Sequence, residues 1–438
     1  MDYKRYWMRK LYHLFFLVFL SFPARAENNT ILKDNLIYQN INDLKNNWHS
    51  STGKGDFDFL QIADRGIQLT DITGDCYAKQ NNEKAVLLRH QKFESDYYFQ
   101  VQVDKFIPAE IYAQVGLVLW KDSDNYIRTT LGFMNPGLES LGEFDGKPES
   151  KALTNIYPKT NPQQVILRME VRKYNVTAFV SWDKNIWYNL GGFVLLQPEV
   201  YKIGIIGVGG RMQQPPVFSN WEEGKLSSYV DNEFNGNNIN PNWRLGQTNI
   251  GWSTGDGKIY QQYGKLFIAP FPGSDFFIGN ETYPYLSIPT PDSATWELEI
   301  KLARFNPFAK GTWNKAGFIL WLGYRNYVSV SAVEDEISKQ MYCESIYWDN
   351  KYAYFGKVHD TAFRKRRITD VYFRIQKAIP AKYRFQVSYN HKDWIDCGEF
   401  DLAQPAAELR LFASGDIFLQ HPKDYDFIAV FDYVRKVE

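Results

Sequence analysis

Paired carboxylates are the first candidates for chemistry in this chain of 438 residues. Hydrolysis of a glycosidic bond uses two carboxyl groups that flank the bond. Glu143 and Asp145 are spaced i, i+2, and so are Glu297 and Glu299. Strand residues with this spacing face the same side, so each pair could act together, but a solvated outer face explains both pairs without catalysis. We favour the solvated face, predict no catalytic residue, and keep these four carboxylates as the alternative.

Aromatic and polar residues are mixed in the segment 342–355. Tyr347, Trp348 and Tyr352 lie there close to Glu344. Sugar recognition combines ring contacts with hydrogen bonds to hydroxyl groups, which makes these four residues candidate ligand-binding residues. Two ordinary strands with one aromatic face in the core would explain the same pattern.

A second set of candidate ligand-binding residues lies in the first half of the chain. Tyr126, Arg128 and Thr130 alternate with apolar or neutral residues, so they share one face of a predicted strand. We predict that this face binds a ligand.

Metal-binding patterns are sparse. Asp122 and Asp124 offer oxygen atoms to a hard cation such as Ca²⁺. A hairpin turn explains both residues without a metal, because Asp tolerates turn geometry. We therefore predict no cofactor, with calcium at Asp122 and Asp124 as the alternative.

Three cysteines are present, at positions 76, 343 and 397. Cys343 and Cys397 lie in the same half of the chain and could form a disulfide in an oxidising compartment. Cys76 would then be left over, and none of the three has the spacing of metal ligands.

An internal repeat organises the whole chain. The segment 114–126 returns at 315–327, and four identities keep the same offset of 201 residues. The identities are Gly116, Trp120, Asn125 and Tyr126 with Gly317, Trp321, Asn326 and Tyr327. Other landmarks repeat at offsets of 195 to 207, as expected when loops gain residues and strands do not.

Within each copy the hydrophobic period is two. Phe99, Val101 and Val103 alternate with polar residues, and Leu298, Ile300 and Leu302 do the same in the second copy. This alternation predicts half-buried strands, and the Gly-, Asn-, Asp- and Pro-bearing turns between them favour an all-β jelly roll or β-sandwich.

Domain boundaries follow from the repeat and from the N-terminus. Residues 1–26 combine a basic start, an apolar stretch and Ala24-Arg25-Ala26, which is typical of a signal peptide, although a membrane anchor is the alternative. We predict one β-sandwich over 27–226 and a second over 227–438. No later apolar run is long enough to span a membrane. Together with the signal peptide, this predicts a secreted or periplasmic protein. We also expect the protein to be a monomer.

The net charge is zero, with 50 basic and 50 acidic residues. Nucleic-acid binding needs a clustered basic surface, so we predict no nucleic-acid partner. Aromatic residues reach 17% of the chain, and we expect most of them in the cores and the excess on a ligand-binding face.

The repeated landmarks together resemble a known family. The order of Gly-hydrophobic-Leu-Trp, a polar turn with Asn-Tyr, and a Ser-x-Asp/Asn hairpin leading to a Trp is similar to the concanavalin A-like domain at the C-terminus of β-xylosidases. The resemblance covers both copies. It implies two tandem concanavalin A-like jelly rolls, a fold often associated with carbohydrate. The catalytic carboxylates of those enzymes belong to a separate propeller, which this sequence does not contain.

These observations favour a non-catalytic protein that binds a polysaccharide or other glycan on a concave sheet face. Two alternatives stay open: a xylosidase- or glucanase-like glycoside hydrolase with paired carboxylates, and a structural module that binds other proteins.

Overall fold

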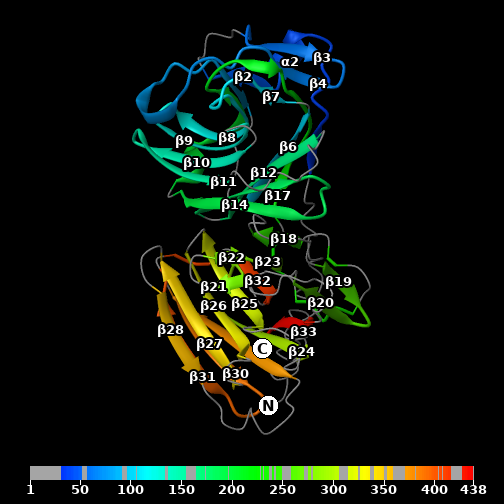
Figure 1. Ribbon diagram of the computed structural model, residues 1–438, viewed down its shortest axis with the longest axis vertical. Coiled ribbons are helices and arrows are strands. Elements are labelled where there is room, and N and C mark those ends of the chain that lie inside the picture. The colour runs from blue at the N-terminus through cyan, green and yellow to red at the C-terminus, as the bar shows by residue number, and fades with distance from the viewer. Residues whose placement is uncertain are drawn as a thin grey trace, which may run out of the picture.

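The segments in which apolar and polar residues alternate form strands in the computed structural model. The strands build two β-sandwiches stacked end to end (Figure 1). The predicted strand at Phe99 is β6 (Tyr97–Asp104), and the one at Leu298 is β24 (Trp296–Arg304). The all-β sandwich fold predicted from the period of two is confirmed.

The structure describes residues 31–437 with gaps, and the signal-peptide region lies outside the described residues. The gaps are 52–56, 91–95, 105, 134–136, 154–163, 173, 196, 227, 230, 236–238, 241–242, 249–257, 271–274, 278–279, 305–313, 324–325, 336–339, 350–352, 359–369, 380, 403, 407 and 416–426. No helix within the described ranges is long and apolar enough to cross a membrane.

One sheet of the first sandwich has the strand order β11-β10-β9-β8-β15-β5-β2. Its strands are β2 (Trp48–Ser50), β5 (Ala85–Arg89), β8 (Gln114–Asp122), β9 (Asn125–Leu131), β10 (Leu138–Phe144), β11 (Lys147–Leu153) and β15 (Lys202–Val208). We call it the site sheet.

The facing sheet of the first sandwich has the order β14-β13-β12-β6-β17-β4-β3, and β1 pairs with β17. Its other strands are β1 (Leu32–Asp34), β3 (Leu60–Ala63), β4 (Gly66–Leu69), β12 (Gln164–Arg172), β13 (Asn175–Ser181), β14 (Trp187–Val194) and β17 (Val217–Lys225). Short elements complete this half: α2 (Ile41–Lys45), η1 (Tyr77–Lys79), η2 (Pro198–Val200) and the paired strands β7 (Ile107–Pro108) and β16 (Met212–Gln214).

The second sandwich repeats this arrangement. One sheet is β28-β27-β26-β25-β32-β23-β18, and the other is β19-β20-β33-β24-β29-β30-β31. The first contains β18 (Arg244–Thr248), β23 (Pro284–Pro289), β25 (Asn314–Gly323), β26 (Asn326–Asp335), β27 (Gln340–Asp349), β28 (Ala353–Val358) and β32 (Glu408–Ser414). The second contains β19 (Lys258–Gln262), β20 (Lys265–Ala269), β24, β29 (Val371–Ala378), β30 (Lys382–Ser388), β31 (Ile395–Asp401) and β33 (Ala429–Lys436), and a separate hairpin joins β21 (Asp275–Phe277) to β22 (Asn280–Thr282).

The two halves therefore match strand for strand. β8 and β25, which carry the repeated Gly-hydrophobic-Leu-Trp segment, are the fourth strands of equivalent sheets. Trp48 in β2 and Trp243 just before β18 are both buried at the last strand of those sheets. The internal repeat predicted from the fixed offset is confirmed, whereas the boundary near residue 226 stays a prediction.

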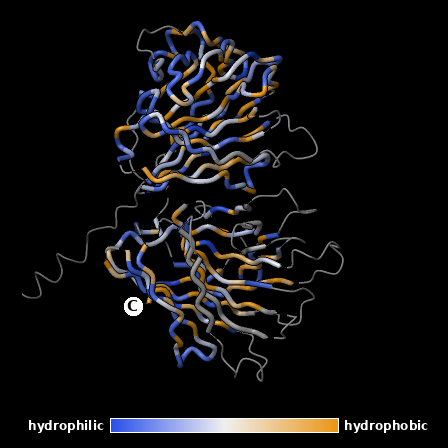
Figure 2. The backbone as a smooth tube through the Cα atoms, turned by 60° about the vertical axis from the view of Figure 1, so that its left-hand side comes forward, coloured by the Kyte–Doolittle hydropathy of each residue, from blue (hydrophilic) through white to orange (hydrophobic). Residues whose placement is uncertain are grey.

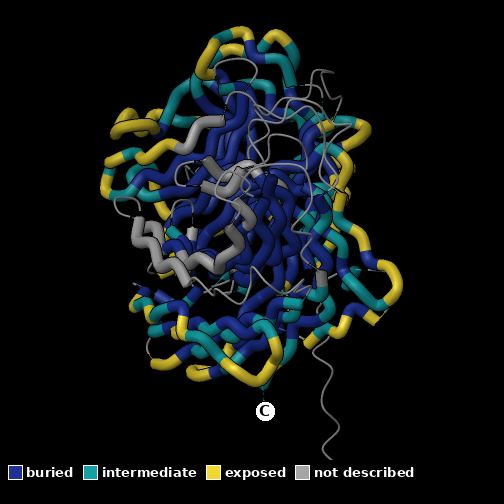
Figure 3. Tube along the Cα trace, turned by 60° about the horizontal axis from the view of Figure 1, so that its bottom comes forward, coloured by how far each residue is buried: buried dark blue, intermediate teal, exposed yellow. Residues whose placement is uncertain are grey.

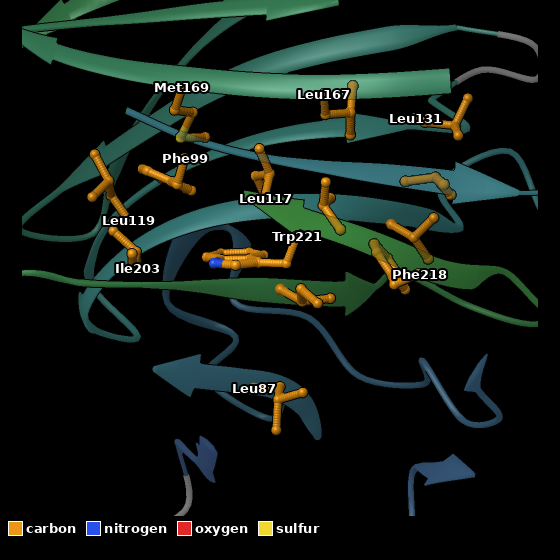
Figure 4. Close-up of a cluster of buried hydrophobic side chains, with 14 of the residues drawn as sticks. Leu87, Phe99, Leu117, Leu119, Leu131, Leu167, Met169, Ile203, Phe218 and Trp221 are labelled. Carbon is orange, nitrogen blue, oxygen red and sulfur yellow. The ribbon is translucent and has the colours of Figure 1, made fainter. Parts of the chain in front are cut away.

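Each sandwich has its own hydrophobic core between its two sheets. In the first, Leu117 and Leu119 of the site sheet meet Phe99, Leu167 and Trp221 from the facing sheet (Figure 4). Hydrophobic stretches run along the strands (Figure 2), and the buried backbone lies inside while loops are exposed (Figure 3). Burial of these apolar side chains is the main stabilising term for each half.

The sheets of the two halves are joined into one sheet of 15 strands. Trp187, Tyr188 and Asn189 of β14 pair in parallel with Gly246, Gln247 and Thr248 of β18. The joined sheets are not equivalent, because β14 belongs to the facing sheet of the first half and β18 to the counterpart of the site sheet. No pattern in the sequence indicates this junction.

A buried ion network crosses the junction. Arg244 of β18 donates through Nη2 to Glu408 Oε1 at 2.8 Å and forms an ion pair through Nη1 with Glu170 of β12. Arg410 donates through Nε to Glu408 Oε2 at 3.1 Å. Gln404 adds a hydrogen bond to Asn175 Oδ1 at 2.5 Å across the same boundary.

Burial alone would raise the pKa of both glutamates, but the nearby guanidinium groups outweigh it. Arg244 and Arg168 hold the pKa of Glu170 below its ordinary value, and Arg244 and Arg410 do the same for Glu408. Both carboxylates are therefore charged in the folded protein at neutral pH.

Replacing Arg244 should destabilise the protein strongly. In Arg244→Met, two buried carboxylates lose their shared cation, and breaking a buried ion pair in this way costs about 3 to 5 kcal/mol. Urea denaturation of wild type and variant measures the difference. Arg211→Met is the matched control, because Arg211 and its partner Glu110 are exposed, and little change is expected there. Equal effects of the two variants would contradict a stabilising role for the network.

Acid should weaken the same junction. The two glutamates have a lower pKa in the folded chain than their ordinary value of 4.5, so their contribution is complete above pH 4.5 and is lost as the pH falls below it. The unfolding free energy, measured between pH 7 and pH 3, should fall less steeply in the Glu170→Gln, Glu408→Gln double variant. An unchanged slope in this variant would assign the acid sensitivity to other groups.

Candidate functional site

The outer face of the site sheet carries a group of polar and charged side chains. Cross-strand partners on this face are Tyr126 with Glu143 and Thr130 with Glu139, while Arg128 lies between them on β9. Tyr126, Arg128 and Thr130 thus share one face, as their alternation predicts. Their assignment as ligand-binding residues stays a prediction.

A pocket of about 700 Å³ opens on this face. It lies between β8, β9 and β10 on one side and the loop 73–82 on the other. The polar residues that line it are Thr73, Asp75, Gln80, Asn82, Gln114, Arg128, Glu139 and Ser150, and the aromatic ones are Tyr77, Tyr112 and Phe133. We call it the site-sheet pocket.

Arg128 forms the charged floor of the pocket and is 2% exposed. Its guanidinium donates to Asp75 Oδ1 at 3.3 Å and to Glu139 Oε2 at 3.4 Å, and its Nε has no hydrogen-bond partner among the described residues. Burial by itself lowers the pKa of Arg128, but neighbouring groups that include Glu139 and Asp75 raise it above its ordinary value. The cation is therefore permanent and fixed in place.

The other floor residues hold one another in position. Glu139 also accepts from Ser150 Oγ at 2.7 Å, and Thr130 donates to Gln114 Oε1. Hydrogen bonds of this kind fix side-chain orientation, and they leave the amide nitrogen of Gln114 and the second lone pair of each Glu139 oxygen to meet a ligand.

Aromatic rings form the rim. Tyr77 is 40% exposed and Tyr112 is 54% exposed, and the rings of Tyr112 and Phe133 lie 6.3 Å apart. Exposed rings beside a polar floor match the needs of a sugar, whose hydroxyl groups require hydrogen bonds and whose C–H faces pack on flat rings.

Glu143 lies on the same face but is shielded from solvent. Its Oε2 accepts from Ala78 N and from Tyr126 Oη, both at 3.0 Å, and the residue is fully buried. Asp145 lies beyond the end of β10 in a turn with a φ of 54°. The structure therefore does not bring Glu143 and Asp145 together at an open cleft.

Glu297 and Glu299 are engaged in contacts on the outer face of β24. Glu299 accepts from Tyr433 at 2.7 Å and His391 at 2.9 Å and pairs with Arg374 and Arg435. Glu297 pairs with Arg374 at 3.1 Å. This face is held by ion pairs, which differs from the freely solvated face we expected.

The second-half candidates occupy β27 and its neighbourhood. Register pairs Glu344 with Ser331, as Glu139 pairs with Thr130, and pairs Trp348 with Tyr327, as Glu143 pairs with Tyr126. Tyr347 pairs with Val328. The side chains of Glu344, Tyr347 and Trp348, and all of Tyr352, lie outside the described residues.

The equivalent face of the second half keeps the aromatic framework and changes the charge. Trp321 and Tyr327 stack at 6.0 Å, as Trp120 and Tyr126 stack at 5.6 Å. Ser329 replaces Arg128 at the repeated offset. The fixed cation of the first-half pocket is therefore not required by the fold.

Asp122 and Asp124 form a turn. Asp122 Oδ1 accepts from Asp124 N at 3.0 Å and from Asn125 Nδ2 at 2.9 Å, and Asp124 Oδ1 accepts from Asn81 Nδ2 at 3.0 Å. In the described part of the chain, no group of three or more His, Cys, Asp or Glu side chains is arranged to hold a metal ion.

The predicted disulfide stays a prediction. Cys397 lies in the second core, and β31, which carries it, contacts β27, which carries Cys343. The side chain of Cys343 lies outside the described residues.

Sequence reasoning missed Asp75, Tyr77, Tyr112, Gln114 and Glu139. Glu139 carried a usable signal, because its spacing from Glu143 puts both on one strand face. The others come from loops or a different strand, and a period of two does not reveal them.

Comparisons with known proteins find similarity to solved structures alone, and this similarity is low. No protein-family model matches the chain, and no curated protein matches it. Similar solved structures include a bifunctional GH43-CE protein of Bacteroides eggerthii, with 14% identity and a TM-score of 0.37 over 73% of this chain and 40% of that one. The GH43 protein BlXynB of Bacillus licheniformis has 13% identity and a TM-score of 0.34 over 71% of this chain and 72% of that one. The carbohydrate-binding module CBM66 of Bacillus subtilis has 11% identity and a TM-score of 0.29 over 41% of this chain and 96% of that module.

Cys76 belongs to the loop 73–82 that closes the pocket and is fully buried, so its thiol should be unreactive. Burial raises its pKa to about 12, so almost no thiolate exists at pH 8. Alkylation with iodoacetamide, followed by peptide mass spectrometry, should label Cys76 slowly in the folded protein and rapidly in urea. Rapid labelling of the folded protein would show that the loop 73–82 opens freely.

Proposed function

We propose that this protein binds a saccharide in the site-sheet pocket without cleaving it. The observation that carries the proposal is the combination of a fixed polar floor, centred on Arg128 and Glu139, with an exposed rim of Tyr77 and Tyr112. A sugar offers hydroxyl groups to the floor and an apolar ring face to the rim.

Hydrolysis is the second candidate, because Glu139 and Glu143 lie on the same strand face. Glycosidases need one carboxyl group to protonate the leaving oxygen and a second to attack or to activate water. Here Glu143 is buried and accepts hydrogen bonds from Ala78 and Tyr126, whereas Glu139 is paired with Arg128. This arrangement favours binding over catalysis.

We also propose that the chain acts outside the cytoplasm, secreted or periplasmic, as a monomer with sandwiches over 27–226 and 227–438. The N-terminal pattern of residues 1–26 supports the location, and the repeat supports the two sandwiches.

A glycan panel tests the proposal. Plant, microbial and host oligosaccharides should include at least one that binds saturably, as measured by isothermal titration calorimetry. Tyr77→Ala should weaken that binding about tenfold, the loss expected for one ring contact with its buried area. Tyr174→Ala is the matched control, because Tyr174 is 45% exposed and does not line the pocket.

Two outcomes would contradict the proposal. Released product sugars in the same incubations, lost in Glu139→Gln, would make the protein a hydrolase. Binding that Tyr77→Ala and Tyr112→Ala both leave unchanged would place the ligand elsewhere.

A further inference from the structure

A second cleft, of about 560 Å³, lies where the two sandwiches meet. The outer face of the first half's facing sheet supplies one wall, with Tyr98 and Arg168. The start of β18 and the residue before it supply the other, with Arg244 and Trp243. The cleft adjoins the β14–β18 junction seen in the middle of Figure 1, so it exists only because the halves are joined.

Positive charge dominates this junction cleft. Among the described residues that line it, five are Lys or Arg and two are Glu. Both carboxylates already have partners: Glu170 pairs with Arg168 at 2.8 Å and with Arg244, and Glu222 accepts from Tyr98 Oη at 2.8 Å. The lining therefore carries an excess of three positive charges, which falls to two when Glu408, the partner of Arg244 behind the wall of the cleft, is counted. This excess attracts an anion into a partly enclosed space.

The cationic groups are held rigidly. The Arg168 guanidinium lies 4.0 Å from the ring centre of Tyr98 and 5.4 Å from that of Trp187. Arg244 is 8% exposed, and its Nε has no hydrogen-bond partner among the described residues. Fixed guanidinium groups lose little entropy when they meet a planar or tetrahedral anion.

Neutral polar groups accompany the charges. The amides of Gln100 and Asn185 and the hydroxyl of Ser287 line the cleft, and Lys184 and Lys225 are exposed at its rim. Amides and hydroxyls recognise the hydroxyl groups of a sugar, while the cations recognise an acidic substituent.

We propose that the junction cleft is a second binding site, which takes the carboxylate or sulfate group of an acidic saccharide. It goes beyond the site-sheet pocket, because it lies on another sheet and uses residues of both halves. One chain of sugars that reached both sites would be held more tightly than by either alone.

Binding of defined oligosaccharides to the full chain tests this proposal. An oligogalacturonate and a sulfated oligosaccharide of similar length distinguish the two acidic groups, and a neutral oligosaccharide and inorganic sulfate serve as references. At least one acidic oligosaccharide should bind saturably, and binding should weaken as salt is raised from low ionic strength.

The rim lysines provide the variants, since both are exposed and are expected to fold normally. Lys184→Gln and Lys225→Gln should each lower the affinity for the acidic oligosaccharide about fivefold, and the double variant more. Lys392→Gln, an exposed lysine on a hairpin of the second half, should have no effect. Binding of any ligand of the site-sheet pocket should be unchanged in the double variant, which separates a failure here from a failure of the proposed function.

The proposal is overturned if no acidic oligosaccharide binds at low salt, or if the double variant binds it as wild type does. It is also overturned if inorganic sulfate or a poly-aspartate peptide binds as tightly as the acidic oligosaccharide, because the cleft would then recognise charge alone.

Discussion

The shared cation of Arg244 is the interaction on which the arrangement of the two halves depends. Glu170 comes from the first sandwich and Glu408 from the second, and both are about 2% exposed. Neither carboxylate can be buried at this junction without a compensating charge. The main-chain pairing of β14 with β18 then sets the relative direction of the sheets. Ion pairing and strand pairing together turn two sandwiches into one continuous structure.

The two copies share the strand order and the buried aromatic framework, but differ at a charged position of the outer face. The Trp–Tyr stack is present in both halves, and the strand order is the same. Arg128, in contrast, is Ser329 in the second copy. Inner-face residues must fill a closely packed core, so they change little without a cost in stability. The Trp–Tyr stack is also buried and is kept, whereas the charged position next to it on the same outer face has changed from Arg128 to Ser329.

Both proposed sites use charge that the rest of the fold has already fixed. In the site-sheet pocket, Asp75 and Glu139 hold Arg128, and in the junction cleft, Tyr98 and Trp187 flank Arg168. Rings and carboxylates in these positions orient the cation before a ligand arrives. The pocket and the cleft differ in their charge. The pocket has carboxylates at its floor, whereas the cleft has an excess of positive charge.

The sequence by itself determined the strands, the repeat and the shared face of Tyr126, Arg128 and Thr130, because alternation along a strand is a local property. It favoured a solvated outer face for Glu143, whereas the structure buries this residue, since Ala78 of a distant loop covers it. Only the tertiary structure decided that loop's position, the pocket that it forms and the joining of β14 to β18. These features depend on contacts between residues far apart in the chain, and no periodic pattern records such contacts.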